Sequence, residues 1–167
     1  MDYILQEDIE YIAQSDMVDW DMLKGKSVLV TGATGLIGSQ IVLALDRYNQ
    51  LHEGQIQIYA LARNEEKAAR VLAGCSEYVR IVLGDIKMPI DITEEIDYII
   101  HGASMTSSKE FVDYPVETIL TGMEGTDNVL RFASSKKVKG MVYLSSLEVY
   151  GVTDPEKKSI KENEYGY

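Results

Sequence analysis

Residues 27–38 read SVLVTGATGLIG, and this stretch decides the fold. Its first five residues, 27–31, form a short apolar run rich in valine, which is typical of a buried strand. Gly32, Gly35 and Gly38 follow at three-residue spacing, and apolar residues at helical spacing come after them. Strand, glycine-rich turn and helix in this order are the context of a turn that binds a dinucleotide diphosphate.

Glycines at this turn allow the backbone to bend sharply and to approach a phosphate closely. The amides of Leu36 and Ile37 begin the helix, so they have no carbonyl partner within it, and they point with the helix dipole at an anion. Gly38 lets the helix pack closely on the strand. A tight turn without a ligand is the alternative interpretation.

Segments with strand character alternate with helical ones along the rest of the chain. Such alternation predicts a parallel sheet with right-handed crossovers and helices on both faces. The expected fold class is therefore α/β, a doubly wound parallel sheet that stops after about the fifth strand. The further strands are expected at residues 55–62, 78–83, 96–101 and 138–145, and the further helices at 65–72 and 116–134.

Residues 1–24 precede this pattern and are predicted to be a helical extension of a domain at 25–167. Leu5, Ile9 and Ile12 share one helical face. The extension either covers one edge of the domain or contacts another subunit.

Composition excludes several classes of protein. The 167 residues contain 27 acidic and 16 basic side chains, a net charge of −11, which argues against nucleic-acid binding. No apolar run reaches the roughly 18 residues of a membrane helix, and the acidic N-terminus does not resemble a signal peptide. The single cysteine, Cys75, forms no internal disulfide. We therefore expect a cytoplasmic protein without membrane, nucleic-acid or metal partners.

The end of the second strand discriminates between the two nicotinamide dinucleotides. An NAD site usually has an acidic residue there, which binds the ribose 2′-hydroxyl. This chain has Ala-Leu-Ala-Arg at residues 60–63, and Arg63 can pair with a 2′-phosphate. The expected cofactor is NAD or NADP, with NADP slightly favoured; a solvated arginine is the alternative.

Two further strand ends supply candidate cofactor contacts. Asp85 follows the third strand, where it can meet the adenine amino group or remain a solvated loop carboxylate. His101 ends the fourth strand, and the small residues Ala103 and Ser104 after it leave room for a ring. His101 itself is equally consistent with a buried core histidine.

Four motifs in this order resemble the extended short-chain dehydrogenase/reductase family, in particular its NAD-dependent epimerases and dehydratases of nucleotide-sugars. They are TGATGLIG at 31–38, GDI at 84–86, HGAS at 101–104 and LSSLEVYG at 144–151. The resemblance implies a Rossmann-type domain that holds NAD or NADP, with Ile86 of the second motif among the contacts. It also implies a nucleotide-sugar substrate and, in many members, a homodimer.

The resemblance further implies a reaction that passes through transient oxidation at C4 of the sugar. Ser146, four residues before Tyr150, would bind the reacting hydroxyl. The family's Tyr-x-x-x-Lys pair has no match, since Tyr165 and Tyr167 are the last tyrosines. We therefore expect an N-terminal part of such an enzyme that does not turn over alone; a non-catalytic dinucleotide-sensing domain is the alternative.

Two departures from the family pattern bear on the chemistry. Related 4,6-dehydratases have Asp-Glu where this chain has Leu147 and Glu148, and leucine cannot protonate a leaving hydroxyl. Plain dehydration is therefore disfavoured, whereas Glu148 can remove a proton at C5 or assist a decarboxylation. A 4-epimerase needs neither residue. Gly122 stands where many members have an asparagine before the Gly125-Thr126 pair.

Overall fold

The computed structural model describes residues 3–105 and 107–164, so Tyr165 and Tyr167 lie outside the described residues. Within these ranges five parallel strands form one sheet, in the order β3-β2-β1-β4-β5. The predicted α/β doubly wound sheet is confirmed. The chain runs outward from β1 to β3 and then returns to build β4 and β5, so the connections switch direction between β1 and β4. In spatial order the strands are β3 (Val79–Leu83), β2 (Gln57–Ala62), β1 (Ser27–Thr31), β4 (Tyr98–His101) and β5 (Gly140–Tyr143).

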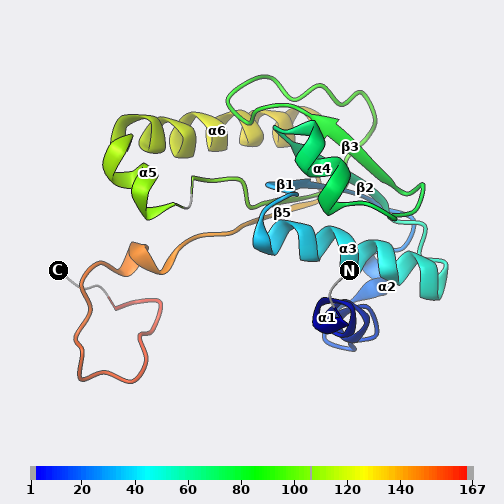
Figure 1. Ribbon diagram of the computed structural model, residues 1–167, viewed down its shortest axis with the longest axis horizontal. Coiled ribbons are helices and arrows are strands. Elements are labelled where there is room, and N and C mark those ends of the chain that lie inside the picture. The colour runs from blue at the N-terminus through cyan, green and yellow to red at the C-terminus, as the bar shows by residue number, and fades with distance from the viewer. Residues whose placement is uncertain (1–2, 106, 165–167) are drawn as a thin grey trace.

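Helices cover both faces of this sheet. Figure 1 shows α3 and α6 on opposite sides, and the segment after β5 runs away from the sheet. None of the helices in the described part of the chain is long and apolar enough to cross a membrane. The helices are α1 (Tyr3–Ala13), α2 (Trp20–Leu23), α3 (Leu36–His52), α4 (Glu65–Val71), α5 (Ser108–Asp113), α6 (Pro115–Lys136) and the 3₁₀ helix η1 (Leu147–Tyr150).

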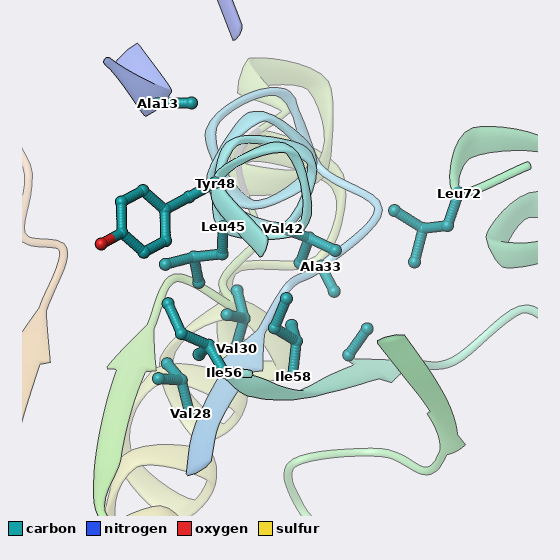
Figure 2. Close-up of a cluster of buried hydrophobic side chains, with 11 residues drawn as sticks. Ala13, Val28, Val30, Ala33, Val42, Leu45, Tyr48, Ile56, Ile58 and Leu72 are labelled. Carbon is teal, nitrogen blue, oxygen red and sulfur yellow. The ribbon is translucent and has the colours of Figure 1, made fainter. Parts of the chain in front are cut away.

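The central strand β1 is buried along its whole length because its side chains enter two separate cores. Val28 and Val30 point toward α3, where they join Ile58 of β2 in one apolar cluster (Figure 2). Leu29 points the other way and joins the cluster under α6, together with Ile99 of β4. Alternation along an apolar strand thus fixes a layer of helices on each face.

Four of the five predicted strands begin one or two residues too early, and the last of them also ends two residues too late. The prediction of a strand from residue 55 is wrong, because Gln55 has a left-handed φ of 55°. Ile56 is held by the side chain of Asn49, which accepts from the Ile56 N–H at 2.8 Å and donates to its carbonyl at 2.9 Å. The strand ladder therefore begins at Gln57.

The N-terminal helices pack against α3. Ile9 of α1 is buried, and Glu10 forms an ion pair with Arg47 of α3 at 2.8 Å. The ring of Trp20 stacks on Tyr48 of α3, with ring centroids 4.0 Å apart. The division into an extension at 1–24 and a domain at 25–167 stays a prediction.

Asp97 links the amino ends of β1, β4 and β5 by hydrogen bonds. Its Oδ2 accepts from the backbone N–H of Ser27 at 3.0 Å and from the Ser27 hydroxyl at 3.1 Å. Its Oδ1 lies 2.7 Å from Nζ of Lys139, just before β5. Burial alone would raise the pKa of Asp97, but the hydrogen bonds from Lys139 and Ser27 outweigh it and lower this pKa below its ordinary value.

We expect Asp97→Asn to lower the free energy of unfolding by about 1–2 kcal/mol at pH 7, since it weakens the three charge-assisted hydrogen bonds to this carboxylate. A lowered pKa means that the ionised carboxylate stabilises the fold above the ordinary aspartate pKa. This contribution is lost as the pH falls through the lowered value, so the effect of the substitution shrinks toward pH 3. Urea denaturation at both pH values measures it. Asp91→Asn, at an exposed position, is the control. If Asp97→Asn lowered the free energy of unfolding equally at both pH values, the stabilising role of the ionised Asp97 carboxylate would be wrong.

Candidate functional site

The carboxyl ends of the strands bring the predicted site residues to one edge of the sheet. Thr31 of β1 pairs with Leu61 of β2 on one side and with His101 of β4 on the other. Ala62 pairs with Leu83, and His101 pairs with Tyr143. The segments that follow these residues therefore all leave the sheet at the same edge, where open α/β sheets bind their ligands.

The glycine turn joins β1 to α3 at this edge. Gly32 has a φ of 71°, and the N–H of Gly35 donates to its carbonyl at 2.9 Å. Gly35 is the N-cap of α3 and provides no side-chain cap. The first hydrogen bond of the helix runs from the N–H of Ser39 to the Gly35 carbonyl at 3.0 Å. The N–H groups before Ser39 in the first turn therefore have no carbonyl partner within the helix.

Because Gly32 and Gly38 have no side chains, three backbone segments approach one another closely at the turn. A Cβ on Gly32 would lie 2.8 Å from the Ala103 nitrogen and from the Gly102 carbonyl oxygen after β4. A Cβ on Gly38 would lie 2.2 Å from the Gly32 carbonyl oxygen. The turn is thus a cradle of main-chain atoms between the ends of β1 and β4. Backbone N–H groups at a helix N-terminus are the kind of group that binds a phosphate, so the turn fits a dinucleotide diphosphate.

The first residues of α3 are apolar and exposed. Leu36 is 82% exposed and Ile37 is 59% exposed, although only the four-residue turn 32–35 separates them from the buried strand β1. Their side chains lie at the edge where the predicted ligand would cover them. The predicted role of their amides is consistent with this placement, but it stays a prediction.

Arg63 follows β2 at the same edge. The side chain of Asn64 accepts from the Lys67 N–H at 2.7 Å and so fixes the start of α4. Arg63 stands just outside this cap and is exposed. The pairing of its guanidinium with a 2′-phosphate stays a prediction.

Asp85 and Ile86 follow β3, and the structure gives them different environments. Asp85 is half-buried, and its carboxylate accepts from the Lys87 N–H at 2.9 Å. Ile86 is buried, and a Cβ on Gly125 of α6 would lie 2.5 Å from its Cδ1. Its side chain belongs to the core, so the predicted cofactor contact of Ile86 can come only from its main chain.

Asn128 of α6 holds this loop, and it was not among the predicted residues. Its Nδ2 donates to the Ile86 carbonyl at 2.7 Å and also to the carbonyl of Met88. The signal for it lies in the helical pattern, since Asn128 comes three residues after the buried Gly125 and one before the buried Val129. A polar side chain beside the buried face of a helix needs a hydrogen-bond partner within the fold.

His101 is a core residue, which settles the two interpretations that the sequence left open. Its side chain is 1% exposed, with Nδ1 2.6 Å from Oγ1 of Thr31 and Nε2 3.3 Å from Oγ1 of Thr126 on α6. Burial lowers the pKa of His101, so the neutral ring is favoured. Thr31 and Thr126 were not predicted as partners.

The remaining candidates lie after β4 and β5. Ala103 is half-buried against the glycine turn, while Ser104 is exposed and its hydroxyl donates to the Met105 carbonyl at 3.3 Å. Ser146 caps η1, where its Oγ accepts from the Glu148 N–H at 3.2 Å, and both residues are exposed. Figure 1 shows η1 in orange, well apart from the start of α3. The structure therefore does not bring Ser146 and Glu148 against the glycine turn.

A separate cavity of about 240 Å³ lies between α1, α3 and the loop after α4. The charged groups of its wall have partners, since Glu10 pairs with Arg47, and Asp46 accepts from Ser76 and Gln50. Burial raises the pKa of Cys75 at its wall to about 11, which makes this thiol a poor nucleophile. In the described residues, no three His, Cys, Asp or Glu side chains gather as a metal site requires.

Known proteins are similar to this chain in sequence and in fold. UDP-glucose 4-epimerase from Rickettsia bellii is 29% identical over 131 residues, which cover 75% of this chain and 38% of that protein. The structure of an epimerase from Methanothermobacter thermautotrophicus matches 93% of this chain and 44% of its own, with a TM-score of 0.73 and 26% identity.

The UDP-glucose 4-epimerase of Bifidobacterium longum, solved in complex with NAD+ and UDP, shares the fold at a TM-score of 0.65 and 23% identity. The match covers 83% of this chain and 42% of that protein. The chain thus spans about two fifths of the relatives that it matches.

The family inferred from the four motifs is confirmed by a family model. The model of the NAD dependent epimerase/dehydratase family matches residues 28–167, which include every predicted site residue. This range begins at β1 and leaves α1 and α2 outside it. Because the match extends over far more than half of the sequence, this chain belongs to the NAD dependent epimerase/dehydratase family.

Proposed function

We propose that this chain supplies the dinucleotide-binding part of a nucleotide-sugar epimerase. The cradle at the start of α3 carries the proposal, since the backbone of the glycine turn, which has no room for a Cβ at Gly32 or Gly38, lies at the switch point between β1 and β4. The amides of Leu36 and Ile37 would bind the diphosphate, and the helix N-terminus would stabilise its charge. An acidic protein needs such a local device, because its net charge of −11 repels anions at long range.

The other strand ends would hold the two nucleoside halves. Asp85 would accept from the adenine amino group, with the main chain of Ile86 beside it. Ala103 and Ser104 would lie along the second nucleoside, because they leave β4 directly next to the glycine turn. When bound, the dinucleotide supplies hydride transfer, and the chain's own residues orient it and exclude water.

The proposed substrate is a UDP-sugar, because the relatives named above are UDP-glucose 4-epimerases. Ser146 would bind the reacting hydroxyl of the sugar, and Glu148 would move a proton at C5 where the reaction requires it. Leu147 between them offers no acid for a leaving hydroxyl, which supports epimerisation rather than elimination. The 3₁₀ turn of η1 presents both side chains to solvent.

Calorimetric titration of the 167-residue protein with NAD+ and with NADP+ tests the function. We expect saturable binding of at least one of them with one site per chain. Absence of binding by both would overturn the proposal.

Arg63 is proposed to favour NADP, since it is exposed at the end of β2 where the 2′-phosphate would lie. We expect wild-type protein to bind NADP+ more tightly than NAD+. Arg63→Gln should weaken NADP+ about tenfold and leave NAD+ nearly unchanged, because it removes one charge-assisted hydrogen bond. Arg70→Gln makes the same charge change on exposed α4 and is the matched control. Tighter binding of NAD+ by the wild type would contradict the NADP preference while leaving the dinucleotide site in place.

A further inference from the structure

The ring of His101 joins three elements beneath the proposed dinucleotide site. It ends β4, contacts Thr31 at the end of β1 through Nδ1, and contacts Thr126 of α6 through Nε2. The side chains of His101 and Thr31 are buried, with 1% and 0% of their surface exposed. The ring of Tyr143 on β5 lies beside the imidazole, with centroids 5.4 Å apart.

The hydrogen bonds around Thr31 have a direction. The backbone N–H of Ala103 donates to Oγ1 of Thr31 at 3.2 Å. The Thr31 hydroxyl also has one proton of its own, and Nδ1 of His101 lies 2.6 Å from its oxygen. If the hydroxyl donates that proton to Nδ1, the neutral ring carries its proton on Nε2, which lies 3.3 Å from Oγ1 of Thr126.

This chain of bonds sets the spacing between two loops. Thr31 immediately precedes Gly32, and its hydroxyl holds the Ala103 N–H. The Thr31 carbonyl also accepts from the Gly102 N–H at 3.2 Å. Gly32 and Ala103 are so close that a Cβ on Gly32 would lie 2.8 Å from the Ala103 nitrogen. A small displacement of Thr31 would therefore move both walls of the cradle.

We propose that His101 is a positioning residue whose neutral, Nε2-protonated ring holds Thr31 and thereby fixes the distance between the glycine turn and the loop after β4. The inference rests on the proposed function, because the two loops are the proposed walls of the dinucleotide site. His101 touches no ligand in this role. It acts through the Thr31 hydroxyl and the Ala103 amide.

The tautomer is tested without any ligand. The chain has two histidines, His52 and His101, so His52→Gln assigns the imidazole signals in a ¹⁵N-detected NMR spectrum. We expect His101 at pH 7 to show one protonated Nε2 and one bare Nδ1. A proton on Nδ1, or a doubly protonated ring, would overturn the assignment.

The positioning role is tested by paired variants. Thr31→Val removes the hydroxyl, and we expect it to weaken dinucleotide binding about tenfold or more, whereas Thr31→Ser keeps the hydroxyl and should stay near wild type. His101→Asn can still accept from Thr31 near the Nδ1 position, while His101→Gln places its amide near Nε2. We therefore expect Asn to retain affinity better than Gln.

Free energies of unfolding are measured for the same variants, which separates positioning from stability. Thr126→Val cuts only the Nε2 contact and should lower stability while leaving affinity within about threefold of wild type. If the affinity of these variants fell only in proportion to their stability, the positioning role would be wrong. Unchanged affinity in Thr31→Val and His101→Gln would also overturn it. These outcomes leave the proposed function intact, whereas a wild-type protein that binds neither NAD+ nor NADP+ overturns the proposed function itself.

Discussion

Gly38→Ala is expected to lower the free energy of unfolding by about 3 kcal/mol, a large part of the stability of a domain of this size. The added Cβ would lie 2.2 Å from the carbonyl oxygen of Gly32 and 2.8 Å from its carbonyl carbon. These are backbone atoms of a turn held between β1 and β4, so they cannot move aside as a flexible side chain would. Urea denaturation followed by circular dichroism measures the loss.

Gly122→Ala is the matched control, because it makes the same change inside helix α6. A Cβ there would meet none of the described atoms within 4 Å. Alanine is the better helix former, so we expect the free energy of unfolding to rise by about 0.5–1 kcal/mol. If Gly38→Ala proved as stable as Gly122→Ala, the close contact between α3 and the glycine turn would be wrong.

Gly35→Asp is expected to weaken dinucleotide binding about 100-fold while preserving the fold. Gly35 is the N-cap of α3, a position where aspartate is favourable because its carboxylate accepts from the first amides of the helix. The same carboxylate would occupy the place of the diphosphate and repel it. Repulsion of about 3 kcal/mol at an intermediate dielectric corresponds to a loss of about 100-fold in affinity.

Gly35→Asn separates charge from size, since asparagine has the same shape without the charge. It also caps helices well, so both variants should differ from the wild type by less than about 1 kcal/mol in stability. We expect Asn to bind the dinucleotide far more tightly than Asp, as measured by calorimetry. Equal affinities of the Asp and Asn variants would show that no anion sits at the start of α3.

Much of the fold was predictable because the strongest signals are local. The valine-rich strand before the glycine turn had to be buried on both faces, and Leu29 and Val30 indeed enter opposite cores. The three-residue spacing of Gly32, Gly35 and Gly38 specified a turn in which side chains have no room, and the structure contains that turn. The alternation of strands with helices then predicted a parallel sheet, which the structure contains.

Long-range polar contacts were not predictable from the sequence. The histidine at the end of β4, His101, could be assigned to a core only once Thr31 and Thr126 were seen on either side of its ring. Asn128 reaches the carbonyl of Ile86 across 42 positions of sequence, and no periodicity reports such a partner. The wrong start of β2 has the same origin, because the Asn49 side chain takes both backbone groups of Ile56 out of the ladder.

Because Trp20 stacks on Tyr48 of α3, its fluorescence reports on the packing of the N-terminal helices against α3. Trp20 is the only tryptophan in the sequence, and it lies on the α3 side, remote from α6. Its emission therefore senses the release of the N-terminal helices from α3, while the far-ultraviolet signal senses helices in both layers. Coincident melting curves from the two signals would mean that the layers come apart as one cooperative unit, and an earlier change in emission would mean that the N-terminal helices detach first.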